Sequence, residues 1–297
     1  MNKKNFTRRD FLKAAAATPL AGVWKSGLGH GGMQNEEEKS RVVLIRDKNA
    51  LVSLKQPDAG AIQKMLDDAV ATLFGEKNVN DAWKKIVEPS DIVGIKSNIW
   101  RFIPTTTEVE QAIKKRLLGA GVIGENISIN DRSVRSDPVF QKATILINAR
   151  PMRSHHWSGV GSLIKNYITF TPNWPAWHGD SCADLAKIWT DFSLKEKTKL
   201  NILVMLTPLF HGIGPHHYSQ KYVWEYRGLI VGRDPVAVDA TGLRIIEAKR
   251  REFFGEDRPL RPPAKHIFLA DTRHKLGNSR PEKIELIKLG WKEDILI

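Results

Sequence analysis

The stretch TILINARPMRSHHWSGVGSLIKNYITF, residues 144–170, decides the fold. Residues 144–150 are apolar and rich in β-branched side chains, which is typical of a buried strand. Pro151 predicts the end of that strand, because proline cannot donate a hydrogen bond to a neighbouring strand. Apolar residues then recur at helical spacing, so the sequence predicts a helix that begins at Ser158 or Gly159. The buried stripe of this helix would consist of Val160, Leu163, Ile164, Tyr167 and Ile168.

The face beside that stripe carries small residues around a single lysine, Lys165. Free N–H groups point outward at a helix N-terminus, so a close-approach surface with one positive charge suits an anionic ligand. The alternative is a solvated polar face without a function. The small residues of this face are Ser158, Gly161, Ser162 and Thr169.

Strands and helices alternate along the rest of the chain. This alternation predicts one large α/β domain over residues 41–297, with a mostly parallel sheet and helices on both faces. No GxGxxG follows the first strand, so the dinucleotide-binding fingerprint is absent from the sequence. The predicted strands are residues 41–47, 92–98, 127–131, 145–148, 200–206 and 228–232. The predicted helices are residues 58–74, 79–87, 107–119, 182–192 and 235–254.

The N-terminus has the pattern of an export signal. Residues 7–13, TRRDFLK, match the twin-arginine motif, and a short apolar run follows over residues 14–23. That run is too short to remain in a bilayer as a transmembrane helix. We therefore predict an export signal over residues 1–30 and a linker over residues 31–40, with the twin-arginine translocation machinery as a partner and the periplasm or cell envelope as the destination. The alternative is a basic amphipathic start to a cytosolic domain.

The charge and cysteine content exclude several classes of site. The chain has 46 Lys and Arg against 33 Asp and Glu, a formal net charge of +13. The basic residues are spread along the chain, which favours small acidic partners over nucleic acid. Cys182 is the only cysteine, so neither an internal disulfide nor a four-cysteine zinc or iron–sulfur site can form.

Residues 144–170 also resemble the prokaryotic family called domain of unknown function 362. In that family a strand runs into Lys-x-His, followed by Thr-Gly-Val-Thr, an aliphatic pair and Lys-Asn. Here the corresponding residues read Arg153-Ser-His155, Ser158-Gly-Val160-Gly161 and Lys165-Asn166. Some relatives carry a cysteine-rich ferredoxin module, and this chain contains no such module.

Further matches extend the resemblance over roughly residues 91–290. Lys96-Ser-Asn98 matches an apolar strand that ends in Lys-x-Asn, and residues 234–239, DPVAVD, match the family's Asp-Pro-Val-Ala-x-Asp. Residues 210–217, FHGIGPHH, resemble its Gly-x-Gly-Pro turn. Where relatives often carry an aspartate at the end of the preceding strand, this chain has Met205. The resemblance implies a fold and a set of matching positions rather than a reaction.

Ligands in such a sheet bind beyond the carboxyl ends of the strands. We expect His155 to act as general base or metal ligand and Asp239 to orient it. Asp239 falls on an apolar helix face, so its alternative role is a salt bridge to a buried Arg or Lys. Three histidines, His155, His178 and His211, allow a divalent metal site. The expected ligand-binding residues are Lys96, Asn98, Lys165, Asn166, Gly212 and Gly214.

The sequence supports two functions of different class. In the first, an exported α/β protein binds a small anionic or metal-containing ligand in a cleft at the strand ends, with metal-dependent catalysis as its extension. In the second, a non-catalytic periplasmic protein helps to assemble or partners a redox enzyme. A buried, metal-occupied cleft would favour the enzyme, whereas a shallow cleft beside an exposed apolar patch would favour the partner protein.

Overall fold

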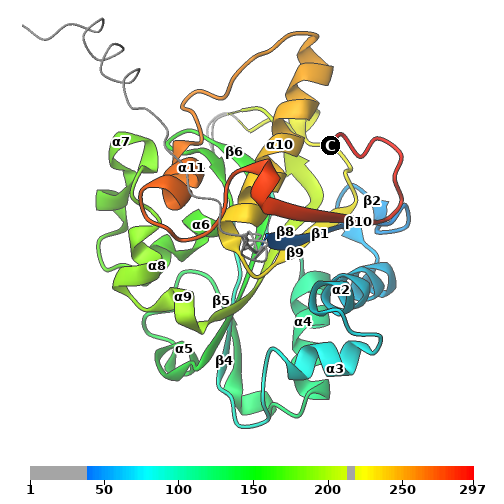
Figure 1. Cartoon of the computed structure of the whole chain (residues 1–297), viewed down its shortest axis with the longest axis vertical. Coiled ribbons are helices and arrows are strands. Elements are labelled where there is room, and N and C mark those ends of the chain that lie inside the picture. Colours follow the sequence, from blue (N-terminus) through cyan, green and yellow to red (C-terminus); the bar gives the residue numbers. More distant parts are fainter. Residues whose placement is uncertain (1–38, 213–217) are drawn as a thin grey trace, which may run out of the picture. The chain divides into compact units, whose positions relative to one another are not determined.

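The computed structural model describes residues 39–212 and 218–297. Its centre is an eight-stranded sheet in the order β10-β1-β9-β8-β6-β4-β5, with β7 paired to β6 (Figure 1). A separate two-stranded sheet joins β2 (Leu51–Ser53) and β3 (Gln56–Pro57). The strands of the large sheet are β1 (Ser40–Arg46), β4 (Val93–Lys96), β5 (Ile127–Asn130), β6 (Ile145–His155), β7 (Gly159–Gly161), β8 (Thr198–Leu209), β9 (Gly228–Gly232) and β10 (Ile284–Gly290).

The pairing makes the sheet mixed but mostly parallel. β5, β4, β6 and β8 are parallel neighbours, as are β1 and β10. β9 runs antiparallel between β1 and β8, and β7 folds back antiparallel on β6. The prediction of an α/β domain with a mostly parallel sheet is therefore confirmed. The carboxyl ends of β4, β5 and β6 meet along one edge, and this edge positions the site.

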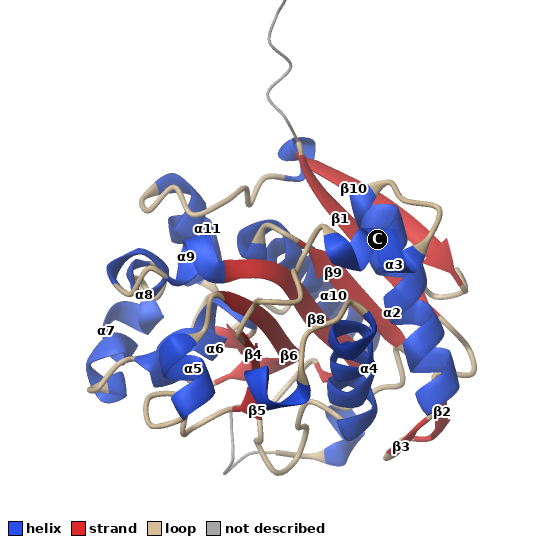
Figure 2. Cartoon of the chain, turned by 90° about the horizontal axis from the view of Figure 1, so that it is seen from below, coloured by secondary structure: helices blue, strands red, loops and turns tan. Residues whose placement is uncertain are grey.

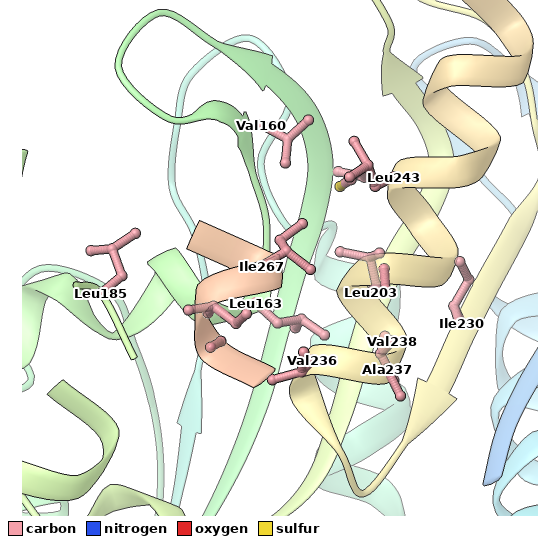
Figure 3. Packing of buried hydrophobic residues seen from close by; sticks show 14 of the residues in the cluster. Val160, Leu163, Leu185, Leu203, Ile230, Val236, Ala237, Val238, Leu243 and Ile267 are labelled. Atoms are coloured by element: carbon pink, nitrogen blue, oxygen red, sulfur yellow. The ribbon is translucent and has the colours of Figure 1, made fainter. Parts of the chain in front are cut away.

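Helices cover both faces of the sheet, and each face has its own buried cluster (Figures 1 and 2). One face packs against α2 (Ala59–Phe74), α3 (Val79–Lys84) and α4 (Thr107–Gly119). The other packs against α6 (Leu163–Asn166), α8 (Lys187–Asp191), α10 (Pro235–Phe254) and α11 (Lys265–Thr272). Figure 3 shows this second cluster, in which β7, β8 and the helices α6, α10 and α11 contribute side chains. The clustered residues labelled there include Val160, Leu163, Leu203, Val236, Leu243 and Ile267.

Local signals account for the ends of the long helices. Asp234 accepts hydrogen bonds from the backbone N–H groups of Val236 and Ala237, and Pro235 occupies the first position of α10. An aspartate cap followed by proline pre-forms a helix start. Gly255, at φ +69°, ends the helix in the left-handed conformation that glycine adopts without strain. The predicted elements 107–119, 228–232 and 235–254 coincide with α4, β9 and α10.

The prediction that Pro151 ends a strand is wrong. β6 continues through it to His155, and its register with β8 shifts between Pro151 and Arg153. The proline therefore lies at an irregularity, where a missing N–H costs little.

The predicted helix start at Ser158 or Gly159 is also wrong. Residues 159–161 form β7, and a four-residue α6 follows before a 3₁₀ turn over Tyr167–Phe170. Gly159 has φ +72°, and a Cβ there would lie 2.6 Å from the carbonyl oxygen of Pro262. Only glycine fits so tight and left-handed a position.

The predicted helix over 182–192 is replaced by two short segments, α7 (Gly179–Cys182) and α8. Asp180, Ser181 and Cys182 have positive φ and interrupt any continuous helix. Other elements were not predicted: the hairpin of β2 and β3, α5 (Pro138–Lys142), α9 (Leu194–Lys197), α11 and β10. No helix within residues 39–212 and 218–297 combines the length and apolarity that a membrane span requires.

Candidate functional site

Lys96, at the end of β4, is completely buried and forms an ion pair. Its Nζ lies 2.5 Å from Oδ1 of Asp131, 2.8 Å from the carbonyl oxygen of Ser97 and 3.3 Å from Oδ1 of Asn166. Burial lowers the pKa of Lys96 to about 8, although Asp131 opposes this change. An ammonium group has three donors, and all three are used here. Protein acceptors therefore occupy all three donors of Lys96, an expected ligand-binding residue.

A chain of buried amides fastens α6 to the sheet. The Nδ2 of Asn166 donates to the carbonyl oxygen of Lys96 at 3.2 Å and to Oδ1 of Asn148 at 2.8 Å. The Nδ2 of Asn148 in turn donates to the carbonyl oxygen of Leu163 at 3.1 Å and to Oδ1 of Asn201 at 3.3 Å. Asn166, an expected ligand-binding residue, thus uses its amide to hold α6 against β4 and β6.

Asp239, on α10, holds the start of α6. Its Oδ1 accepts from the backbone N–H of Leu163 at 2.9 Å, and its Oδ2 accepts from Ile164 N–H at 2.9 Å and Ser162 Oγ at 2.7 Å. Burial raises the pKa of Asp239 to about 6, and these hydrogen bonds oppose the rise. Within the described residues no hydrogen bond joins Asp239 to His155. The described geometry does not favour the expectation that Asp239 orients His155, which stays a prediction, because the carboxylate accepts from Ser162 and the start of α6.

Lys165 is 3% exposed and has no carboxylate partner within the described chain. Its Nζ lies 2.9 Å from Nε2 of His178 and 3.6 Å from Sγ of Cys182. Burial lowers the pKa of Lys165 to about 8; Cys182 raises it, and the charges of Arg150 and Arg153 lower it further. The predicted small-residue face around Lys165 is buried rather than solvated, since Ser158 and Ser162 are both inaccessible.

His178 uses both ring nitrogens. Burial, with the Lys165 charge, lowers its pKa to about 4, so the ring is neutral at pH 7. Its Nδ1 lies 3.3 Å from the carbonyl oxygen of Pro175. A neutral ring has one donor and one acceptor, so Nδ1–H donates to Pro175 and Nε2 accepts from Lys165. That assignment leaves His178 without a lone pair for a metal ion.

Arg150, in the middle of β6, has no hydrogen-bond acceptor among the described residues. It is 4% exposed, and its Nε lacks any partner there. Burial lowers the pKa of Arg150 to about 10, while the charges of Asp131 and Asp239 oppose the change. A Cβ on Gly161 would lie 2.9 Å from Nη2 of Arg150 and 3.5 Å from Cδ2 of His155. Glycine at 161 therefore makes room for the guanidinium beside His155.

Arg153 is held by the loop that follows β4. Its Nη1 donates to Oδ1 of Asn98 at 2.9 Å, and its guanidinium lies 4.4 Å from the centre of the Trp100 ring. Burial, with the neighbouring Arg150, lowers its pKa well below the ordinary value. Asn98, an expected ligand-binding residue, thus positions Arg153.

Buried positive charge exceeds buried negative charge around α6. Four cationic side chains share this region with the carboxylates of Asp131 and Asp239. The cations are Lys96, Arg150, Arg153 and Lys165. Among these four, and counting carboxylates of the described residues, Lys96 alone forms a salt bridge. Uncompensated charge of this kind is costly in a folded interior.

A cavity of about 800 Å³ opens beyond the ends of β5 and β6. His155 and His178 line it together with Trp157 and Trp174, and Thr169 contributes a hydroxyl that has no partner in the described residues. Burial lowers the pKa of His155 well below its ordinary value, with Lys165 and Arg153 acting in the same direction. His155 is therefore neutral at pH 7, and its Nδ1 accepts the N–H of Trp157 at 3.2 Å.

The histidines proposed for a metal site are not gathered around one point. His211 lines a different cavity, of about 490 Å³, where its Nδ1 lies 3.0 Å from Nη1 of Arg250. Across the described ranges, no group of three or more His, Cys, Asp or Glu is arranged to hold a metal ion. The carbonyl oxygen of Gly212 accepts from Ser154 Oγ. Gly214 lies outside the described residues.

Sequence reasoning missed Arg150 as a site residue. The signal was present, because a charged side chain inside an otherwise apolar strand requires a partner. Arg153 was noted only as a replacement for the lysine of the resembled motif.

The comparisons with known proteins cover this region. A family model described as a domain of unknown function (DUF362) matches residues 132–244. The matched segment contains Arg150, His155, Lys165 and Asp239, and Lys96 lies outside it. No curated protein and no solved structure matches the chain.

Proposed function

We propose that this protein binds a small carboxylate-containing anion that enters from the cavity beyond β5 and β6 and places its negative charge at Arg150 and Lys165. These two side chains do not line the cavity but lie beside the lining residues His155 and His178. The observation that carries the proposal is the buried guanidinium of Arg150, whose Nε has no hydrogen-bond partner in the described chain. A guanidinium presents parallel N–H donors that match the two oxygens of a carboxylate. A bound anion would supply the missing acceptor and offset the surplus positive charge.

Enzyme activity is an extension of this proposal. His155 and His178 are neutral at pH 7 and line the cavity, so either ring can take up or pass on a proton. Asp239 is a positioning residue for α6 in this proposal. A metal at His155, His178 and His211 stays a prediction that the described geometry does not favour, because His211 lies in another cavity.

The first test is ligand-dependent stability. Pyruvate, lactate or phosphate at millimolar concentration should raise the melting temperature of the parent protein by mass action. In Arg150→Met most of that gain should disappear. The unliganded variant should be as stable as the parent or more stable, because a buried unpaired charge has been removed. Thermal unfolding with and without each anion measures both effects.

Arg46→Met is the matched control. Arg46 is also buried, but its Nε donates to the carbonyl oxygen of Tyr226 at 2.7 Å. This variant should lose stability without ligand and keep the full ligand-dependent gain. Equal gains in Arg150→Met and the parent would rule out the anion site.

The second candidate function is a non-catalytic assembly or partner protein for a redox enzyme. It is favoured by the aromatic side chains at the cavity mouth, where Trp157 is 43% and Trp174 49% exposed. Exposed aromatic side chains are common at protein interfaces. A protein of this kind would show no anion-dependent stabilisation in the assay above.

Export by the twin-arginine route is part of the proposal and rests on the sequence alone, since residues 1–30 lie outside the described residues. Replacing Arg8 and Arg9 with lysine keeps the charge and should leave the protein in the cytoplasm. Cell fractionation with immunodetection measures the distribution. Normal appearance of the double variant beyond the inner membrane would contradict the signal.

A further inference from the structure

We propose that Lys165 is an amine nucleophile that condenses with the carbonyl group of a 2-oxo carboxylic acid that enters from the cavity past His178. This inference rests on the proposed anion site, with Arg150 holding the carboxylate. It adds a covalent step and a substrate class, the 2-oxo acids. The closing experiment separates the covalent step from the binding on which it depends.

The contrast with Lys96 motivates the assignment. Both lysines are buried, but the three donors of Lys96 are all matched by acceptors, one of them the carboxylate of Asp131. Lys165 contacts only the Nε2 of His178 and the thiol of Cys182 through its Nζ, within the described residues. A lysine without a carboxylate partner, placed among other cations, is the arrangement that favours the nucleophilic free amine.

Burial lowers the pKa of Lys165; among the described neighbours, the charges of Arg150 and Arg153 lower it further, and the thiol of Cys182 raises it. His178 and the buried His266 are neutral, and the Lys165 charge lowers the pKa of each. The carboxylate of α10, Asp239, accepts hydrogen bonds from the first residues of α6. Besides these effects of Arg150 and Arg153 on Lys165, the charge of Lys165 lowers the pKa of His155.

The position of Arg150 explains how a substrate carboxylate would be bound near Lys165. Its Nη2 lies against Gly161 beside His155, and the Nζ of Lys165 lies 2.9 Å from Nε2 of His178. Both histidines line the cavity, so the two cations lie behind neighbouring parts of its wall. In a 2-oxo acid the carbonyl carbon is bonded directly to the carboxylate. A carboxylate drawn to Arg150 would bring that carbon toward the side of the cavity wall where Lys165 lies, and such proximity is what the reaction requires.

The step needs no other reactant. The neutral amine of Lys165 adds to the carbonyl carbon, a C–N bond forms, and the carbonyl oxygen becomes the hydroxyl group of a carbinolamine. Loss of that oxygen as water, with the two hydrogens of the amine, gives the imine. Nothing is oxidised or reduced. His178 Nε2 accepts a hydrogen bond from Lys165 and is placed to relay a proton during the step.

Reductive trapping tests the inference on the full chain. The protein is incubated with pyruvate and cyanoborohydride, and intact mass and peptide mapping locate the reduced adduct. We expect one adduct per chain, on Lys165, and none in Lys165→Arg. Its rate of formation should rise with pH through about 8, the pKa of Lys165, because the free amine is the reactive form. The exposed Lys64 and Lys84 are internal controls and should stay unmodified.

The outcomes separate the two proposals. Pyruvate that stabilises the parent, fails to stabilise Arg150→Met and leaves no adduct would overturn the imine and leave the anion site standing. Neither stabilisation nor adduct would overturn both. Labelling spread over surface lysines and unchanged in Lys165→Arg would also overturn the imine. Acetone, a ketone without a carboxylate, should label Lys165 at least tenfold more slowly if Arg150 positions the substrate.

Discussion

Asp131→Asn is expected to lower the free energy of unfolding by about 3–5 kcal/mol at pH 7. The completely buried ammonium of Lys96 would then either stay without a carboxylate to balance it or lose its proton, and both outcomes cost stability. The Asp131 side chain is 7% exposed, and its second oxygen accepts the backbone N–H of Ile99 at 3.0 Å. Urea unfolding of the parent and the variant measures the loss.

Two further variants make this result specific. The double variant Asp131→Asn with Lys96→Met should recover most of the stability, because no unpaired charge remains. Asp68→Asn breaks the exposed pair of Lys64 and Asp68, and such surface pairs contribute less than about 1 kcal/mol. A cost for Asp131→Asn no larger than that of Asp68→Asn would show that Lys96 does not depend on its partner.

The titration of Lys96 determines how the stability of the Asp131→Asn variant changes with pH. Burial already lowers the pKa of Lys96 to about 8 in the parent, below its value in the unfolded chain. Between these two pKa values the unfolded state binds more protons, so this group makes stability rise with pH. Without Asp131 the pKa of Lys96 falls further. The increase of the free energy of unfolding with pH should therefore begin at a lower pH in the variant than in the parent.

The elements that could be predicted from sequence are those with local signals at their ends. α10 begins with an aspartate cap and a proline and ends at Gly255. α4 and β9 were also located residue for residue. In each of these elements the apolar residues recur with the period of a single type of secondary structure. The pattern of burial and the local signals therefore predict the same element.

Residues 158–170 could not be predicted in this way. Val160, Leu163, Ile164 and Tyr167 have helical spacing, yet Val160 belongs to β7 and Tyr167 to a 3₁₀ turn. All four are fully buried. In a segment that is covered on every side, the spacing of apolar residues shows that the segment is buried but does not show that it is helical. The turn at Gly159 depends on the backbone of residues 262–264, about a hundred residues away, which no local pattern reveals.

The sequence predicted which of the expected site residues share one edge of the sheet, but not which partners they have. The carboxyl ends of the strands do bring Lys96, Asn98 and His155 to one edge, as the α/β rule implies. Whether a buried lysine is free or paired depends on long-range partners, and Asp131 is 35 residues from Lys96 in the chain. For the same reason the sequence could not identify Arg150 as a site residue. That its Nε lacks an acceptor can be seen only once the neighbouring residues are placed in space.

The other large effect is expected at Asp239. Asp239→Ala removes the acceptor of two backbone N–H groups and of the Ser162 hydroxyl, all in the interior. Unsatisfied buried donors cost about 1–3 kcal/mol each, so a loss of roughly 3–5 kcal/mol is expected once partial relaxation is allowed for. Because α6 carries Lys165, the anion-dependent gain in melting temperature should fall as well.

Asp58→Ala is the matched control for that loss. Asp58 caps α2 near the surface by accepting from the N–H of Ala61 at 2.7 Å. Removing one such cap costs about 1 kcal/mol and should leave the anion-dependent gain intact. If both substitutions had the same small cost, Asp239 would not hold α6 in place.

Asp239→Asn tests the charge of the carboxyl group separately from its shape. The folded-state pKa is about 6 against an ordinary value of 3.8, so the folded protein binds the proton more tightly than the unfolded chain. The stability from this group is therefore complete below pH 3.8 and is lost as pH rises through about 6. The size of that loss is on the order of 3 kcal/mol. An asparagine does not titrate, so the stability difference between the parent and Asp239→Asn should shrink by this amount from pH 4 to pH 7. Urea unfolding of both proteins across that range measures it, and a difference that is constant or grows with pH would mean that the hydrogen bonds from α6, not burial, set the ionisation of Asp239.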